Sequence, residues 1–144
     1  MIMTTPSKRL LLALPLVLAL AACGPSGPAF SPVAQLPENK ALVYIYRTGA
    51  LGAAVTYTVH DGNQEVVELQ TGGYYPYLAE PGEREFWART EAKASTTEQL
   101  RPGETYYLKG GIGVGFLVGH PKLAFVSREV GEREIKGCRL IKTK

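Results

Sequence analysis

The sequence predicts an all-β protein, an antiparallel β-sandwich of about seven to nine short strands. Three observations support this fold class. Turn-forming pairs such as Asp61-Gly62, Pro81-Gly82 and Pro102-Gly103 recur through most of the chain at intervals of about ten residues. The runs between these pairs are rich in Val, Ile, Tyr and Thr, which favour strands. No helical period is sustained, and only residues 130–136 are expected to form a short helical turn.

The expected strands follow these turn signals along the chain. Their ranges are 41–47, 53–60, 64–70, 74–80, 83–91, 94–100, 105–110, 112–118 and 122–127. The apolar residues Val55, Tyr57 and Val59 alternate with polar ones, which is the pattern of a strand with one buried face. Gly62 then suits a tight hairpin, because the primed turns of hairpins require a positive φ that glycine adopts without strain.

The first residues have the pattern of an export signal, which is removed from the mature protein. Lys8 and Arg9 provide a positively charged start, and residues 10–20 follow as an apolar run interrupted by Pro15. This run is too short to cross a bilayer, which needs about 20 apolar residues. Residues 1–22 are therefore predicted to be a cleaved signal helix and not a membrane span.

The end of this signal matches the bacterial lipobox, in which an apolar residue and two small residues precede a cysteine. Leu20 and Ala21 are followed by Ala22 and Cys23. Cleavage is expected between Ala22 and Cys23, whose thiol accepts diacylglycerol, so a lipid would anchor the protein to a membrane. The alternative is a plain secretory signal. Gly24 replaces the Asp of the best-known inner-membrane retention signal, which favours an outer membrane location facing the periplasm.

A short segment separates the predicted lipidation site from the predicted domain. Residues 24–39 contain four Pro, two Gly and one charged residue, a composition typical of a flexible tether. Such a tether would span about 20 Å as a coil and about 50 Å when extended. The predicted organisation is a signal peptide, a lipidated cysteine with its tether, and a sandwich domain, at 1–22, 23–39 and 40–144. Alternatively, Phe30 and the stretch 33–36 dock onto the domain.

Charge and composition exclude several classes of function. The net charge of +3 falls to +1 when Lys8 and Arg9 are removed with the signal, so the mature chain lacks the basic excess of a nucleic-acid binder. The chain has one Asp, two His and two Cys, too few for a recognisable metal site or catalytic triad. We therefore expect no catalytic residue, metal or cofactor. Cys138 is expected to be a packed thiol, with an intermolecular disulfide as the alternative.

Several motifs, taken in order, resemble a family of small bacterial lipoproteins, domain of unknown function family 2846. The motifs are ALVYIYR at 41–47, Asp61-Gly62, GYY at 73–75, Pro81-Gly82 and GETYYLKGG at 103–111. The resemblance covers about residues 38–140 and implies a β-sandwich lipoprotein that faces the periplasm. A weaker resemblance links the chain to PEGA-like sandwich modules. Neither resemblance implies an activity, a substrate or a catalytic residue.

Two groups of residues are candidates for a binding surface. Tyr75 and Tyr77 share one face of their strand, and Trp87 lies on a later strand; exposed together, these rings could stack on sugars. Ile112 and Val114 belong to a Gly-rich segment, 110–119, which as an apolar strand edge could pair with a partner. The competing interpretation of both groups is ordinary packing within the sandwich.

The sequence as a whole predicts a lipid-anchored envelope protein that acts without catalysis, through surface contacts with a protein partner. Its alternative function is binding of glycan or peptidoglycan through the aromatic rings. An envelope hydrolase is a third reading, which would need a cleft that unites His60 or His120 with a serine or a carboxylate. The sequence leaves the partner and the oligomeric state open.

Overall fold

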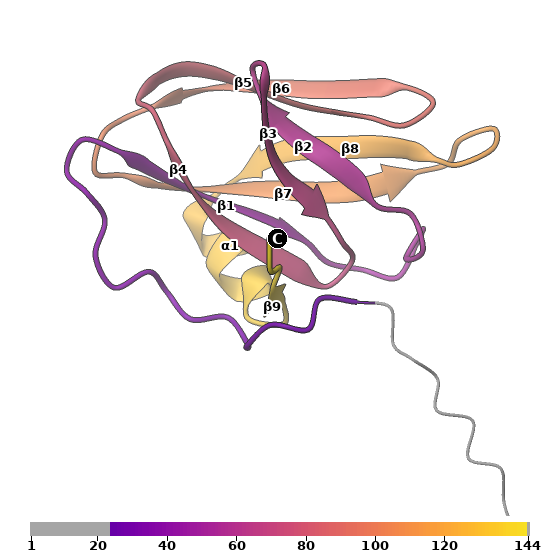
Figure 1. Ribbon diagram of the computed structural model, residues 1–144, viewed down its shortest axis with the longest axis horizontal. Helices are drawn as coiled ribbons and strands as arrows, with labels where there is room; N and C mark the ends of the chain where they lie inside the picture. Colours follow the sequence, from indigo (N-terminus) through magenta and orange to yellow (C-terminus); the bar gives the residue numbers. More distant parts are fainter. Residues whose placement is uncertain (1–23, 144) are drawn as a thin grey trace, which may run out of the picture.

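Two β-sheets and one short helix form along residues 24–143, the part of the chain that the computed structural model describes (Figure 1). The elements are β1 Ala41–Arg47, β2 Tyr57–Asp61, β3 Gln64–Leu69, β4 Gly73–Ala79, β5 Gly82–Arg89, β6 Lys93–Leu100, β7 Thr105–Gly113, β8 His120–Val126, α1 Arg128–Ile135 and β9 Arg139–Leu140. The predicted signal, with its cleavage site and Cys23, lies outside the described residues.

The strands confirm the all-β sandwich. One sheet has the order β8-β7-β1-β4-β9 and the other the order β3-β2-β5-β6. The first sheet is mixed rather than purely antiparallel, because β1 runs parallel to β7 and β4 runs parallel to β9. Parallel neighbours need a long crossover, and here the chain passes through the second sheet between β1 and β7.

Strand β1 is buried along its whole length, because both faces of its sheet are covered. Ala41, Val43 and Ile45 face the second sheet and belong to the core between the layers. The alternate residues Leu42, Tyr44 and Tyr46 belong to a second apolar cluster on the outer face of the first sheet. The continuous apolar run of β1 is therefore the pattern of a strand buried on both faces.

Helix α1 covers part of that outer face. Its N-cap is Ser127, whose hydroxyl accepts a hydrogen bond from the Val130 N–H at 3.3 Å. Gly131 lies against the ring of Tyr107, so close that a Cβ built on the glycine would be 2.2 Å from the ring Cγ. Ile135 and Cys138 complete the second cluster. The helical turn predicted over residues 130–136 is confirmed, with an earlier start.

Residues 24–36, here called the N-terminal strap, pack against the domain, so the expectation of a freely flexible tether is corrected. The Gly27 N–H donates to the Leu140 carbonyl at 3.2 Å, and the Leu140 N–H donates to the Pro28 carbonyl at 2.9 Å. Phe30 places its ring edge-on to Tyr44 and Tyr74, with centroids 5.3 and 5.1 Å apart. The structure thus agrees with the alternative expectation, in which Phe30 docks onto the domain.

Most strand boundaries differ from expectation by one or two residues, and two segments differ by more. Residues 105–113 form one strand, although two strands were expected, 105–110 and 112–118, with a break at Gly111. Gly110 sits in the strand because the Leu69 side chain and the Tyr57 hydroxyl occupy the space that a Cβ would need. The strand expected over 53–60 begins only at Tyr57, since the preceding residues belong to the β1–β2 loop.

Candidate functional site

The three aromatic residues predicted as a binding surface do not share a face. Tyr75 and Tyr77 pack against the core between the sheets. Trp87 alternates with the buried residues Phe86 and Ala88, which places it on the outer face of the second sheet. There its ring stacks on His60, with centroids 3.9 Å apart, and its indole N–H donates to the Gly62 carbonyl at 2.7 Å. The structure therefore shows no joint platform of these rings.

Tyr77 instead belongs to a buried polar cluster. Its hydroxyl donates to Asp61 at 2.9 Å, and Arg84 binds both oxygens of the same carboxylate at 2.9 and 2.7 Å. Asp61 is 2 % exposed, so this pairing satisfies a charge that the fold has buried. Burial and the bond to Asp61 raise the pKa of Tyr77 to about 12. Through these bonds Asp61 joins strands β2, β4 and β5.

The predicted strand edge at Ile112 and Val114 is also corrected. Ile112 lies in β7 and pairs with Pro121 of β8, whereas the pairing of β7 with β1 ends at Gly110. Val114 lies in the β7–β8 loop, residues 114–119, and is 89 % exposed. Residues 114–118, which were expected to continue the strand, therefore present their apolar side chains on a loop.

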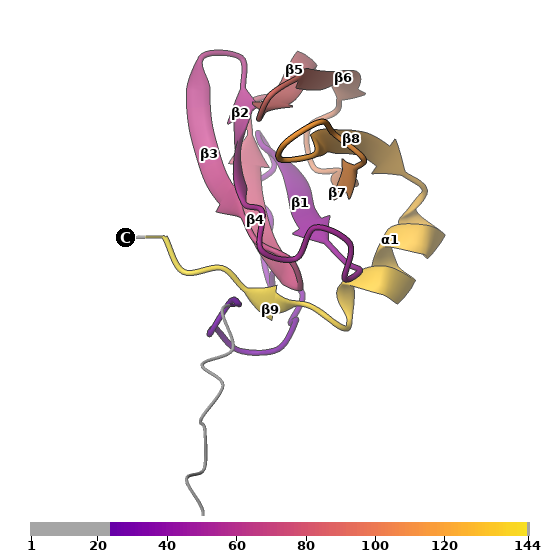
Figure 2. The same cartoon turned by 90° about the vertical axis from the view of Figure 1, so that its right-hand side faces the viewer.

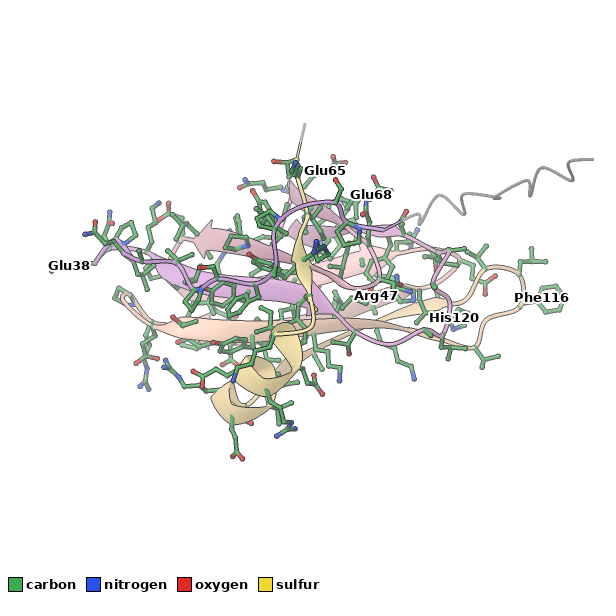
Figure 3. All side chains as sticks on the ribbon, turned by 90° about the horizontal axis from the view of Figure 1, so that it is seen from below. Glu38, Arg47, Glu65, Glu68, Phe116 and His120 are labelled. Carbon is green, nitrogen blue, oxygen red and sulfur yellow. The ribbon has the colours of Figure 1, made fainter. Side chains whose placement is uncertain are left out.

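One end of the molecule carries most of the exposed apolar side chains. Of the seven large hydrophobic residues that are exposed within 24–143, four lie in the β7–β8 loop and one in the β1–β2 loop, residues 48–56. They are Leu51, Val114, Phe116, Leu117 and Val118. Phe116, at 92 %, is the most exposed of them, and its ring projects at the extreme end of the molecule in Figure 3. We call these five residues the apolar tip.

The β1–β2 loop is held from inside by Arg47. This guanidinium group is 1 % exposed, and among the described residues no carboxylate pairs with it. It donates instead to the carbonyls of Val55 at 2.6 Å and Gly52 at 2.7 Å, and it lies over the Tyr57 ring. Burial lowers the pKa of Arg47. The charge thus fixes the backbone that carries Leu51.

The β7–β8 loop is held by Glu91, in the turn of the β5–β6 hairpin. Its carboxylate accepts hydrogen bonds from the N–H groups of Phe116 at 2.7 Å and Leu117 at 3.0 Å. These bonds lower the pKa of Glu91, the bond from Leu117 having the largest effect. His120 places its Nε2 3.2 Å from the same carboxylate. With the loop backbone bound inward, the apolar side chains are left facing solvent.

The two loops lie next to each other. A Cβ on Gly52 would meet the Ile112 side chain at 2.8 Å, so the β1–β2 loop rests on the end of β7 directly before the β7–β8 loop. Figure 1 shows both loops, together with the β5–β6 turn, at the same end of the sandwich. The apolar tip is therefore one surface built from two segments that are distant in sequence.

Basic side chains lie behind the apolar tip. Arg89 and Lys93 flank the turn that holds Glu91, and Lys122 lies on β8 with its side chain against Gly113. Lys93 pairs with Glu85 at 3.4 Å, while no ion pair joins Arg89 or Lys122 to a carboxylate of residues 24–143. Neither tip loop contains a charged residue.

The other candidates for chemistry stay apart. Within the described range, no three His, Cys, Asp or Glu side chains lie close enough together to hold a metal ion. His60 lies on the outer face of the second sheet and His120 beside Glu91 at the tip. Cys138 is 1 % exposed, and burial raises the pKa of its thiol to about 11.

Comparison with known proteins adds no relative: no family model, no curated protein and no solved structure matches the chain. Among the residues that the structure describes, none of the helices has the length and apolar character needed to span a membrane.

Sequence reasoning found Val114 but missed the remainder of the apolar tip. The apolar run Phe116, Leu117 and Val118 stands out in the sequence, but the pattern of strands and turns assigned it to the edge strand of a sheet and not to a loop. Arg47 gave no local signal because its partners are backbone carbonyls. Glu91 gave none either, since it meets its partners across two hairpins.

Proposed function

We propose that the chain is a lipid-anchored lipoprotein of the bacterial cell envelope that works without catalysis, as an interaction module. Its thioether-linked lipid at Cys23 would fix its location, facing the periplasm from the outer membrane. The apolar tip would make its contacts. The resemblance to domain of unknown function family 2846 belongs to this proposal and rests on the sequence motifs.

The observation that carries the interaction role is the construction of the tip. Monomeric proteins seldom gather large exposed apolar side chains without a function for them. Here Phe116, Leu117 and Val118 follow one another on a loop whose backbone is fixed by a carboxylate. A fixed loop loses less conformational entropy on binding than a mobile one, so it is suited to contact.

Anchoring and contact can be tested separately in the organism's envelope or in a bacterial host. The mass of the N-terminal peptide of the mature protein should show Cys23 with diacylglycerol attached, and Cys23→Ser should abolish both that mass and sedimentation with membranes. An unmodified Cys23 would overturn the anchoring.

Contact is tested with a photo-crosslinking residue in place of Leu117, and the matched control carries it at Glu38. Glu38 is exposed and lies at the opposite end of the molecule (Figure 3). Crosslinks to envelope components are expected from position 117 and not from 38. Equal labelling from both positions would overturn the assignment of the tip.

A further inference from the structure

The geometry points to the bilayer as the surface that the apolar tip contacts: we propose that Phe116 and its neighbours insert into the membrane that carries the lipid anchor. This inference rests on the proposed lipidation of Cys23 and adds an orientation and a contact surface to it. The sandwich would stand on the membrane with its tip down.

The first support is where the described chain begins. Gly24 lines a depression together with Ala53 and Ala54 of the β1–β2 loop. Leu51 lies in that same loop, and Gly52 packs against Ile112 near the end of β7, just before the β7–β8 loop. Viewed onto this end, the β1–β2 loop lies between the β7–β8 loop and the beginning of the strap (Figure 2). Gly24, the first described residue, therefore lies near the tip loops, and the predicted lipidation site is its neighbour in sequence.

The second support is the short free length of chain. The strap is bonded to β9 from Gly27 onward, through the Gly27 N–H and the Pro28 carbonyl. A Cβ on Gly27 would lie 2.2 Å from the Leu140 carbonyl oxygen, so the two backbones are in close contact. Only four residues of sequence separate Cys23 from this first hydrogen bond at Gly27, a length of about 14 Å when fully extended. The domain therefore cannot lift its tip far from the lipid surface.

The third support is the chemistry of the tip and of the region behind it. The five side chains are aliphatic or aromatic, they project outward from loops, and neither loop bears a charge. Apolar side chains of a surface-bound protein enter the boundary between headgroups and acyl chains in this way. Behind them, Arg89 and Lys122 have no carboxylate partner among the described residues. They lie at the level where phosphate headgroups would meet them.

The test places a fluorophore at the tip of the acylated, full mature protein. Trp87→Phe removes the native tryptophan, and Phe116→Trp or, as the matched control, Glu38→Trp adds one at either end. Each protein is reconstituted into vesicles of phosphatidylethanolamine and phosphatidylglycerol, with and without bromine on the acyl chains. Because the indole of Trp87 donates a hydrogen bond to Gly62, its replacement can disturb the fold. Both variants are therefore also made with Trp87 retained, and the emission of the protein that contains Trp87 alone is subtracted from theirs.

We expect brominated chains to reduce the emission at position 116 at least twofold and to leave position 38 unchanged. Equal quenching at both positions, or none at 116 in protein whose N-terminal peptide carries lipid, would overturn tip insertion and leave anchoring intact. A tip that is unquenched but crosslinks to a second copy would also overturn it. Absence of lipid on Cys23 would instead refute the proposed function.

Discussion

Two ionised side chains bind backbone at the end of the sandwich, and each acts on a different loop. Arg47 donates to carbonyls of the β1–β2 loop, and Glu91 accepts from N–H groups of the β7–β8 loop. Loop backbone needs hydrogen-bond partners wherever water is excluded. In this protein charged side chains supply these hydrogen-bond partners. The apolar side chains of the loops are therefore not needed to hold the loops in place and can be exposed.

Replacement of Arg47 by methionine should lower the stability of the protein strongly. The variant loses two buried bonds from a charged donor, worth about 3 kcal/mol in the free energy of unfolding. Urea unfolding followed by circular dichroism measures this change. The control Arg89→Met, at an exposed position, should change the free energy by less than about 0.5 kcal/mol. Equal effects of the two substitutions would contradict the role given to Arg47.

Acid should loosen the β7–β8 loop through Glu91. The pKa of this carboxyl is lowered from its ordinary value of 4.5, so its stabilising bonds are fully present above pH 4.5. They are lost as the pH falls through the lowered value in the folded protein. NMR relaxation of the Phe116 and Leu117 amides should show increased motion as the pH is lowered below 4.5. In Glu91→Gln these amides should be mobile already and show no such step; a persistent step would assign it to another group.

The strands were predicted well from local sequence wherever the structure of a segment depends on its own residues and not on distant partners. Strand β1 matches its predicted range because its β-branched and aromatic residues suit a strand in any context. The misjudged segments depend on distant partners. The Gly110-Gly111 pair predicts the end of a strand, but β7 continues through it, and Gly110 accommodates Leu69 and Tyr57 from the other sheet. The Pro-rich strap reads as a spacer, but Phe30 meets rings on β1 and β4.

Most of the candidate site escaped sequence analysis for the same reason. Val114 was predicted because it stands in a conspicuous Gly-rich run, whereas Leu51 joins it only because Gly52 packs on Ile112. Alternation predicted correctly that Tyr75 and Tyr77 share a face, but no local pattern says which face of a strand meets the second sheet. That depends on the topology, which also separates these rings from Trp87.

The packing of α1 on β7 gives a prediction for two glycines, one inside the helix and one just after its C-cap. Gly131→Ala should destabilise the protein by about 1–3 kcal/mol, since the new methyl would overlap Tyr107 near its Cβ and Cγ. This cost exceeds the gain of about 1 kcal/mol that alanine brings to a helix. The matched control is Gly137→Ala, where the nearest atom is 3.8 Å away. Chemical denaturation should show little change there, and equal losses at both sites would contradict the contact.

For the whole molecule, the strap determines how anchoring and tip contact are coupled. A short connection keeps the tip at a high effective concentration near the lipid, and that concentration falls with roughly the −3/2 power of linker length. The strap is bonded to β9 at Gly27 and packs through Phe30 on the outer face of the first sheet. It therefore shortens the sixteen-residue spacer of the sequence to its first few residues.

Lengthening that connection should weaken the tip's contact with the bilayer and spare both folding and anchoring. Sixteen Gly and Ser residues inserted between Gly24 and Pro25 extend a free length of about four residues to about twenty, which lowers the effective concentration about tenfold. Quenching of Phe116→Trp by brominated chains should fall accordingly. The urea midpoint and the lipid mass on Cys23 should stay unchanged, because the insertion precedes every contact of the strap with β9. Undiminished quenching would show that the bonded strap does not hold the tip at the membrane.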